Sequence, residues 1–456
     1  MNQYRASLSR REFLRIAGLT TAAISLAACQ AELPAEPPSN QDSVRLVYQD
    51  WRTDWFPGLA QEMLAIFHAQ HPNIRVFYTP DPDNLEEAML EEMEAGTAPD
   101  VFSGCCAFFP AWAQKGHTLD LSSYVETGLD KSTIQDWSQA QYNYFFTTDG
   151  KQYALPKYNG GLALYFNKDL FDEASLPYPD GSWNYDKYME AMQALTFHEA
   201  GMPGRWGSMV DVSWDRLQIH VNGWGGHFVN PEDPTHCDLS KQPALDAVEW
   251  LRARMWDDRV MATALDVENM ETREAFIHQK IAMVEDGSWA LKDILDKSTF
   301  RVGVAPFPIG PVRHATLATT DGFAIYSGTQ HPEEAWELLR FLVGPEYGRA
   351  MARAQFLQPA RASLIPDWTR YIQDEYPEKA SGLEVAAFAD GQINGYAVTT
   401  EIFPNMLEVT NMAREVFDRI LTLGQAPVTE LKQLCEQIET LQVGANNLPV
   451  LCDCKV

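Results

Sequence analysis

The sequence is poor in positive charge and in long apolar segments. Lysine and arginine number 35 against 63 aspartates and glutamates, so the formal net charge is −28. Binding to nucleic acid needs basic side chains that neutralise phosphates, and the imbalance argues against such a partner. It also disfavours anionic ligands, although one local basic pocket can overrule a net charge. Beyond the N-terminal region, no apolar run approaches the length of a membrane span.

Motifs of common enzyme classes are missing as well. The chain has no G-x-x-x-x-G-K-[ST] phosphate loop and no G-x-S-x-G nucleophile elbow. His198-Glu199 lacks the second histidine of H-E-x-x-H, and Gly223-Trp224-Gly225-Gly226 does not continue as a dinucleotide-binding fingerprint. A C-x-C at Cys452 and Cys454 has no second cysteine or histidine pair to complete a metal site. The sequence therefore predicts no catalytic residue, no metal and no cofactor.

The N-terminal residues have the features of an export signal. Ser9-Arg10-Arg11-Glu12-Phe13-Leu14 matches the twin-arginine (Tat) pattern, and the apolar stretch after it is too short to span a bilayer comfortably. Leu26-Ala27-Ala28-Cys29 resembles a lipobox, in which a peptidase cuts before the cysteine and its thiol carries lipid. We predict a signal peptide at 1–28, a lipid anchor on Cys29 and a flexible, proline-rich tether at 29–42. The protein would then lie at the outer face of the cytoplasmic membrane or in the periplasm.

Six cysteines remain after Cys29, and disulfides are permitted outside the membrane. Six cysteines allow 15 full pairings, and the sequence does not choose among them. A bond from Cys435 to the tail cysteines is one candidate, because it would tie down the C-terminus. The adjacent Cys105 and Cys106 cannot easily bond to each other without strain. The six are Cys105, Cys106, Cys237, Cys435, Cys452 and Cys454.

Strand-like and helix-like segments alternate from residue 44 onward. Val44–Tyr48, Ile74–Tyr78 and Asp100–Phe102 have the composition of strands. Between them, helical spacing of apolar residues predicts helices over Pro57–His71 and Leu85–Ala95. This alternation is the signature of an α/β domain with a largely parallel sheet. Further strands are expected at 153–156, 162–166, 281–284, 300–304 and 323–326, with helices at 183–195 (capped by Ser182), 242–256 and from Pro332 to Gly344.

Several short blocks follow one another along most of the chain in a recognisable order. Tyr165-Phe166-Asn167-Lys168-Asp169-Leu170-Phe171 is similar to "Y-Y-N-K-D-x-F" and is the most specific of them. Other blocks are Gly96–Val101 ("G-x-x-P-D-V"), Lys280–Met283 ("G-K-A-A-M" without its glycine), His331–Trp336 ("H-P-E-x-A-W") and Gln358–Arg361 ("P-x-R"). Together they resemble the extracellular solute-binding proteins of carbohydrate ABC importers, the maltose-binding-protein-like group.

The resemblance implies a two-lobed α/β fold of the type II periplasmic-binding-protein kind, with a ligand cleft between lobes joined by a hinge that the chain crosses several times. It places the first lobe at 43–156 plus 305–344 and the second at 157–304 plus 345–456. It also implies that the protein captures a sugar or oligosaccharide, delivers it to ABC permease subunits, works as a monomer and has no enzymatic activity.

A sugar-binding site needs aromatic rings for the apolar faces of the sugar and polar side chains for its hydroxyls. In open α/β sheets such groups follow the carboxyl ends of strands. Trp289 lies where the family often offers a stacking tryptophan, and for Trp289 and Trp51 ligand contact explains the position better than packing. The expected ligand-binding residues are Asp50, Trp51, Trp55, Tyr158, Asn159, Trp214, Asn222, Trp224, Asp286, Trp289, Asp321, Gly322 and Arg361.

Three other functions stay open at this point. The solute could be a polyamine, a glycerol phosphate or a peptide instead of a sugar. The chain could be an exported polysaccharide-active enzyme, which would need a pair of carboxylates across the cleft. It could also be a sensory lipoprotein that passes its closed state to a signalling partner.

Overall fold

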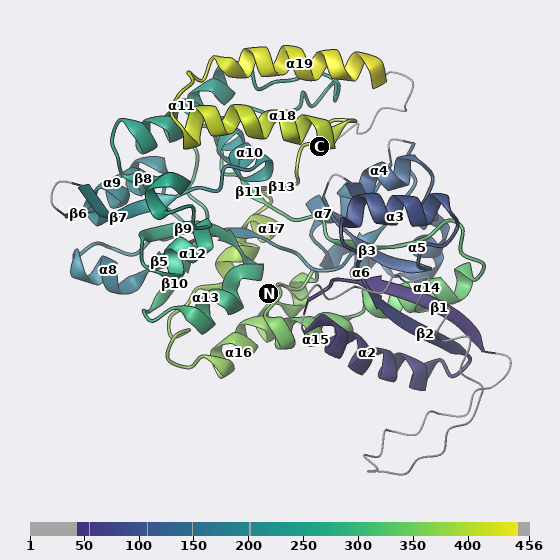
Figure 1. Ribbon diagram of the computed structural model, residues 1–456. Helices are drawn as coiled ribbons and strands as arrows, with labels where there is room; N and C mark the ends of the chain where they lie inside the picture. Colours follow the sequence, from purple (N-terminus) through teal and green to yellow (C-terminus); the bar gives the residue numbers. More distant parts are fainter. Residues whose placement is uncertain (1–42, 54, 107, 148, 200–201, 446–456) are drawn as a thin grey trace, which may run out of the picture. The chain divides into compact units, whose positions relative to one another are not determined.

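The computed structural model describes residues 43–53, 55–106, 108–147, 149–199 and 202–445 (Figure 1). The predicted signal peptide, lipidated Cys29 and tether lie outside these described residues, as do Cys452 and Cys454. Among the described residues, no helix combines the length and the apolar composition needed to span a membrane.

The first sheet contains five strands in the order β2-β1-β3-β12-β4. β1 pairs in parallel with both β2 and β3, and β12 runs antiparallel between β3 and β4. The first three strands are parallel to one another, as expected, and the α/β alternation is confirmed. The prediction of a largely parallel sheet was wrong, because β12 returns antiparallel between β3 and β4 and makes the sheet mixed. The strands are β1 (Val44–Asp50), β2 (Ile74–Pro80), β3 (Val101–Gly104), β4 (Leu155–Pro156) and β12 (Gly322–Ile325).

Helices cover both faces of this sheet. Successive residues of a strand point to opposite faces, so neighbouring residues pack against different helices. Val101 packs in a cluster with α2 (Phe56–Gln70), α14 (Pro332–Leu342) and α15 (Pro345–Gln355). The next residue, Phe102, packs on the other face with α3 (Leu85–Glu94) and α4 (Phe108–Gln114). Short helices complete this part of the chain: α5 (Ser122–Gly128), α6 (Lys131–Asp136) and α7 (Gln139–Tyr144).

The second sheet has the order β10-β5-β9-β7-β6, with β8 also paired to β7. β7 runs parallel to β8 and β9, whereas β5 is antiparallel to both β9 and β10. The strands are β5 (Leu162–Asn167), β6 (Phe197–Glu199), β7 (Met202–Met209), β8 (Met261–Ala262), β9 (Ile281–Gly287) and β10 (Val302–Ala305).

The remaining helices are mostly C-terminal or surround the second sheet (Figure 1). They are α8 (Lys168–Glu173), α9 (Tyr185–Leu195), α10 (Trp214–Gly223), α11 (Gln242–Trp256), α12 (Thr272–Ile277), α13 (Leu291–Lys297), α16 (Ile365–Glu375), α17 (Asp390–Asn394), α18 (Met406–Phe417) and α19 (Glu430–Ala445). Short 3₁₀ segments are Ala264–Val267, Ser288–Ala290, Ala362–Leu364 and Val385–Ala389, and Asp418–Thr422 is a π-helical turn.

The chain passes from the first sheet to the second at 157–161 and returns at 306–321. A two-stranded sheet of β11 (Thr316–Leu317) and β13 (Ala397–Val398) accompanies the return segment. The lobe boundaries stay a prediction. Tyr347 and Met351, which the predicted boundary assigns to the second lobe, belong to the hydrophobic cluster of the first sheet.

Two local predictions were wrong. The helix expected from residue 183 begins at Tyr185, and Asn184 rather than Ser182 is its cap: the Asn184 side chain accepts a hydrogen bond from the backbone N–H of Lys187 at 3.0 Å. The Ser182 hydroxyl instead donates to Asp180. Asn184 has the extended backbone that an N-cap requires, and the preceding residue, Trp183, is buried in the core.

The candidate bond between Cys435 and the C-terminal tail was also wrong. Cys435 forms a disulfide with Cys237, 198 residues away in the sequence, with a Cα–Cα distance of 5.2 Å. Both cysteines are buried in the hydrophobic cluster that α9, α10, α11 and α18 share with α19. The packing of α19 on this core, rather than sequence proximity, decides which cysteine Cys435 meets.

Candidate functional site

A cavity of about 550 Å³ lies at the carboxyl edge of β7, β8 and β9. Because β8 and β9 both run parallel to β7, the segments that follow all three strands leave the sheet at the same edge. Asp211 follows β7, Thr263 follows β8, and Asp286 lies near the end of β9. This edge is where open α/β sheets bind their ligands, and the volume lies within the range of small-molecule sites.

The wall of the cavity carries more carboxylates than cations. Arg273 donates to the buried Asp286 carboxylate, with its Nε 2.8 Å from Oδ2, so this cation is already paired. The other guanidinium, that of Arg216, is half-buried. The surplus of acceptors suits hydroxyl or cationic ligands and opposes anionic ones. The charged residues of the wall are Asp211, Glu271, Glu285, Asp286 and Asp418 against Arg216 and Arg273.

Trp289 supplies the large aromatic surface of the cavity. The Arg216 guanidinium lies 5.1 Å from the centroid of its ring. Trp289 is half-buried and contacts three separate hydrophobic clusters. A Cβ atom on Gly160 would lie 2.5 Å from the ring, and one on Gly287 would lie 2.1 Å from it. Only glycine at these two positions therefore leaves room for the indole in its observed position.

A second polar group lies at the carboxyl ends of β1 and β3, in the first sheet. Asp50, the last residue of β1, and Lys157 form an ion pair whose side chains have no exposed surface. The ammonium of Lys157 lies 4.4 Å from the ring centroid of Phe56 and 5.1 Å from that of Trp51. Burial lowers the pKa of Lys157, and the neighbouring Asp50 opposes that shift.

Asp321 belongs to the same group. It precedes β12, and its backbone carbonyl accepts a hydrogen bond from Lys157 N at 3.0 Å. Burial raises the pKa of its carboxyl to about 6, although the Lys157 charge and hydrogen bonds from Thr319 and Tyr158 act in the opposite direction. Gly322 pairs with both Gly104 and Pro156, and a Cβ at that position would lie 2.7 Å from the Phe145 ring. We call Asp50, Trp51, Lys157, Tyr158 and Asp321 the first-sheet cluster.

The structure thus brings Asp286 and Trp289 into the cavity and places Asp50, Trp51, Tyr158, Asp321 and Gly322 at the first-sheet cluster. Trp55 and Asn159 lie close to that cluster but are engaged elsewhere. The Trp55 ring packs 4.7 Å from that of Phe56, and the Asn159 amide donates to Gln392 Oε1 at 2.6 Å.

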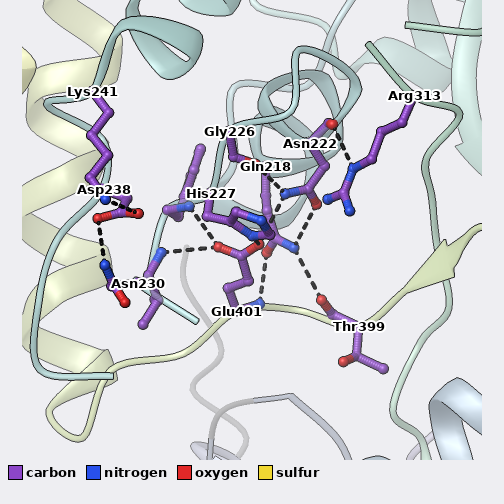
Figure 2. A network of polar contacts seen from close by, with 12 residues as sticks. Gln218, Asn222, Gly226, His227, Asn230, Asp238, Lys241, Arg313, Thr399 and Glu401 are labelled. Atoms are coloured by element: carbon purple, nitrogen blue, oxygen red, sulfur yellow. Dashed lines mark hydrogen bonds and ion pairs between the residues drawn. The ribbon is translucent and has the colours of Figure 1, made fainter. Parts of the chain in front are cut away.

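Trp214 and Asn222, both on α10, contact Glu401. Figure 2 shows Asn222 in the polar network around the Glu401 carboxylate. The Glu401 carboxylate is bonded to Asn222 Nδ2 at 2.9 Å and His227 Nδ1 at 2.8 Å, and it accepts a bond from Phe228 N at 2.6 Å. The indole N–H of Trp214 donates to the Glu401 carbonyl at 2.8 Å. These contacts fasten the segment around Glu401 to α10, and they occupy both residues outside the cavity.

Trp224 and Arg361 also lie apart from the cavity. The Trp224 ring meets Tyr185 edge to face at 4.6 Å between centroids. The Arg361 guanidinium donates twice to the carbonyl of Val343, at 3.1 and 3.2 Å, and lies 3.6 Å from Asp136. Trp224 therefore has a packing contact, and Arg361 has polar contacts, outside the cavity.

Sequence reasoning missed Asp211, Arg216 and Arg273. Asp211 and Arg216 follow β7, whose sequence Met-Pro-Gly-Arg-Trp-Gly-Ser-Met contains proline and two glycines and was not recognised as a strand. Arg273 is one of many charged residues on short surface helices, and only the fold reveals its pairing with Asp286. Among the described residues, no group of three or more histidine, cysteine or acidic side chains is placed to hold a metal ion.

Residues 49–349 match the sequence model of a family described as bacterial extracellular solute-binding protein. The chain belongs to this family. The members are binding proteins, so the protein is a solute-binding protein and not an enzyme.

Individual relatives are distant in sequence and close in fold. A multiple sugar-binding protein of Streptococcus mutans is 22% identical over 337 residues, covering 72% of this chain and 77% of its own. An ABC substrate-binding protein of Listeria monocytogenes, solved with cycloalternan, has a TM-score of 0.75 at 22% identity and covers 88% of this chain and 100% of its own. UgpB of Mycobacterium tuberculosis, solved with glycerophosphocholine, has a TM-score of 0.73 at 16% identity and covers 89% and 100%. These matches confirm the α/β periplasmic-binding-protein fold.

Proposed function

We propose that the protein is the substrate-binding component of an ABC importer and that it captures a sugar or oligosaccharide for delivery to the permease. The observation that carries the proposal is the cavity at the edge of β7, β8 and β9, where the Trp289 ring lies among carboxylates and two guanidiniums. An indole can pack on the apolar face of a sugar, and the charged groups can bond its hydroxyls. The multiple sugar-binding relative and the cycloalternan complex support the same ligand class.

The cavity lies at the second sheet, and the first-sheet cluster would contact the same ligand from the first lobe. Trp51 offers a second aromatic surface, and Asp321 offers a carboxyl group whose pKa is raised to about 6. A ligand held by both groups would stabilise a closed form of the protein, which the permease could recognise. This arrangement requires two lobes. We propose them at 43–156 plus 305–344 and at 157–304 plus 345–456, with Tyr347 and Met351 of α15 packed on the first.

Export and anchoring complete the proposal. The twin-arginine pattern and the lipobox support cleavage before Cys29 and attachment of lipid to its thiol, with 29–42 as a tether. Membership of an extracellular family agrees with this location. Incorporation of labelled fatty acid into the wild type, and its loss in Cys29→Ser, tests the anchor; labelling of both proteins or of neither would contradict it.

A cationic solute, such as a polyamine, is the second candidate. Five carboxylates against two guanidiniums line the cavity, and one of the guanidiniums is paired with Asp286. An ammonium group could also lie against the Trp289 ring. The acidic wall disfavours a phosphate ester, although UgpB, of the same fold, was solved with glycerophosphocholine.

Thermal unfolding against a panel of solutes separates these candidates. A ligand that binds only the folded protein raises the unfolding midpoint, by an amount that grows with its concentration relative to Kd. The panel contains mono- and oligosaccharides, polyamines and glycerophosphodiesters. We expect one sugar series to raise the midpoint. A shift with a polyamine or a phosphodiester and with none of the sugars would overturn the carbohydrate assignment.

A further inference from the structure

Two adjacent cysteines directly follow β3, and the proposed function gives them no role. Cys105 is half-buried, Cys106 is exposed, and their sulfur atoms lie 2.6 Å apart as thiols. Two unbonded sulfur atoms do not pack so closely, and a disulfide bond measures about 2.05 Å. Cys106 has a φ of 57°, in the left-handed region that a cysteine seldom adopts. The backbone therefore holds the two sulfurs together at a cost in strain.

The pair borders the first-sheet cluster. In the antiparallel ladder of β3 and β12, Gly104 lies opposite Gly322, so Cys105, the residue after β3, comes beside Asp321, the residue before β12. β3 is also parallel to β1, so Cys105 and Trp51 leave the sheet at the same edge. The Cys105 thiol is close enough to Asp321 and Lys157 for their charges to influence it.

The chain already contains one disulfide, Cys237–Cys435, which indicates an oxidising environment. The same environment would act on Cys105 and Cys106. Hydrogen bonding to Cys106, burial and the Asp321 charge all raise the pKa of the Cys105 thiol, so a thiolate is disfavoured there. A disulfide carries no ionisable proton and fits this position beside a carboxyl group.

We propose that Cys105 and Cys106 form a reversible vicinal disulfide at the border of the ligand site, and that its redox state controls ligand affinity. The oxidant is the disulfide of a thiol–disulfide exchange protein outside the membrane. One cysteine sulfur attacks that disulfide, and the second displaces the exchange protein. The two thiols lose two electrons and two protons, which leave as the two thiols of the reduced partner. A strained, accessible disulfide is more easily reduced than a buried one such as Cys237–Cys435.

Oxidation of the pair would fix Cys105 and Cys106 in one conformation beside Asp321 and Tyr158. Reduction would release this constraint and leave two separately mobile side chains, which ligand binding would have to immobilise again. The half of the proposal that concerns affinity rests on the proposed function, whereas formation of the disulfide does not.

Peptide mapping tests the disulfide without any ligand. Cleavage after Arg75 and Lys115 releases the tryptic peptide Val76–Lys115, which contains Cys105 and Cys106 and no other cysteine. From the exported full-length protein, digested without reductant and with a thiol-blocking reagent present, we expect this peptide to be unblocked and two hydrogen atoms lighter than its dithiol form. A peptide carrying two blocking groups, or a native protein mass that includes a metal ion released by denaturation, would overturn the proposal.

Calorimetric titration tests the effect on binding. The ligand is the sugar that gives the largest thermal shift, and the protein is equilibrated in oxidising and in mildly reducing glutathione buffers. We expect affinity to fall about tenfold, or about 1.4 kcal/mol, on reduction, and the variant C105S/C106S to show the lower affinity in both buffers. The control variant C237A/C435A should respond to glutathione as the wild type does.

Equal affinity of the wild type in both buffers, with the disulfide proven by mapping, would overturn its role in binding. If no sugar binds even the oxidised protein, the proposed function fails, and the mapping alone then decides whether the disulfide forms.

Discussion

Trp289 holds its position in the cavity because two neighbours lack side chains. Gly160 lies in the segment that joins the two sheets, and Gly287 ends β9, yet a Cβ on either would collide with the same indole. The ring is therefore held between two distant parts of the chain and faces the Arg216 guanidinium. An aromatic side chain fixed in this way loses little freedom when a ligand packs on it.

Trp289→Ala should weaken sugar binding about thirtyfold, or by about 2 kcal/mol, because it removes the main apolar surface of the site. Affinity is measured by calorimetric titration. Trp224→Ala is the matched control, since Trp224 packs on Tyr185 outside the cavity and its loss should leave affinity within about twofold of the wild type. Equal losses in both variants would contradict the assignment of the site.

The raised pKa of Asp321 should make the folding stability depend on pH. Its folded-state pKa, about 6, lies above the ordinary value of 3.8, so the protonated form is favoured by folding. The stability that this group contributes is fully present below about pH 3.8 and is lost as pH rises through 6. The loss is about 3 kcal/mol between these limits, from about 1.4 kcal/mol for each pH unit.

Asp321→Asn should remove this contribution to the pH dependence. Urea unfolding at pH 4 and pH 7 is the measurement. The free energy of unfolding of the wild type should change between the two pH values by about 2.4 kcal/mol relative to the variant, in the direction of lower stability at pH 7. Glu126→Gln, at an exposed position of α5, is the control and should follow the wild type. If Asp321→Asn keeps the wild-type pH profile, the carboxyl is not protonated in the folded protein.

At this scale, the sequence predicted residues that end strands better than residues on helices. Asp286 and Trp289 follow an apolar run that is recognisable as a buried strand, so their position at the edge of the sheet could be inferred. Trp214 and Asn222 lie on α10, where the rotation of the helix decides which residue faces the cavity. The structure turns both toward Glu401 and leaves Arg216 facing Trp289, which a sequence pattern does not reveal.

At the scale of elements, α9 depends on its N-cap. The Asn184 side chain accepts from the Lys187 N–H, one of the amides that a helix leaves unbonded at its start. Asn184→Ala should lower the free energy of unfolding by about 1 kcal/mol, measured by urea denaturation. Ser182→Ala is the control, because the Ser182 hydroxyl bonds Asp180 and not the helix, and it should cost less than Asn184→Ala. A larger loss of stability in Ser182→Ala than in Asn184→Ala would indicate that Ser182 is the cap after all.

The helix α19 is held to the second sheet's core by the disulfide. Cys237 and Cys435 close a loop across 198 residues, and such a link removes much of the freedom of the unfolded chain. The variant C237A/C435A should lose about 3 kcal/mol of stability, seen as a lower thermal midpoint. Its sugar affinity should be unchanged, because neither cysteine lines the cavity. An unchanged midpoint would mean that the two cysteines are not bonded in the folded protein.

Helices and strands with a regular sequence pattern could be predicted, and those without one could not. β5 and β9 each begin with a continuous apolar run, and α11 and α14 have apolar residues at helical spacing and a proline in the first turn. All four could therefore be predicted. β7 could not, because its proline and glycines are typical of turns. Its place between β6, β8 and β9 is imposed by tertiary pairing. The prediction of the α9 cap was wrong for a similar reason. Ser182 and Asn184 are both good caps, and the burial of Trp183 decides between them.

At the scale of the whole molecule, the fold supports a prediction about closure. If the cavity and the first-sheet cluster contact one ligand from two lobes, binding should favour the more compact form. The radius of gyration from small-angle X-ray scattering should decrease when a saturating amount of the sugar is added. Trp289→Ala, at a sugar concentration well below its own Kd, should keep the larger radius. A wild-type radius unchanged by sugar would contradict closure and leave binding to be judged separately.

The α/β architecture was predictable because strand and helix patterns alternate and ordered family blocks span the chain. The cavity was less so, since its wall combines segments after three strands with α12 and the turn at Asp418–Thr422, and no local pattern connects these. We expect this cavity, at the carboxyl edge of β7, β8 and β9, to hold the sugar.

A crystal structure of the protein with the sugar that gives the largest thermal shift would show where the ligand binds. We expect a sugar ring packed on the indole of Trp289, with hydroxyls bonded to wall residues such as Asp211, Asp286 or Arg216. A sugar bound away from Trp289, or a cavity occupied by a cationic solute carried through purification, would contradict it.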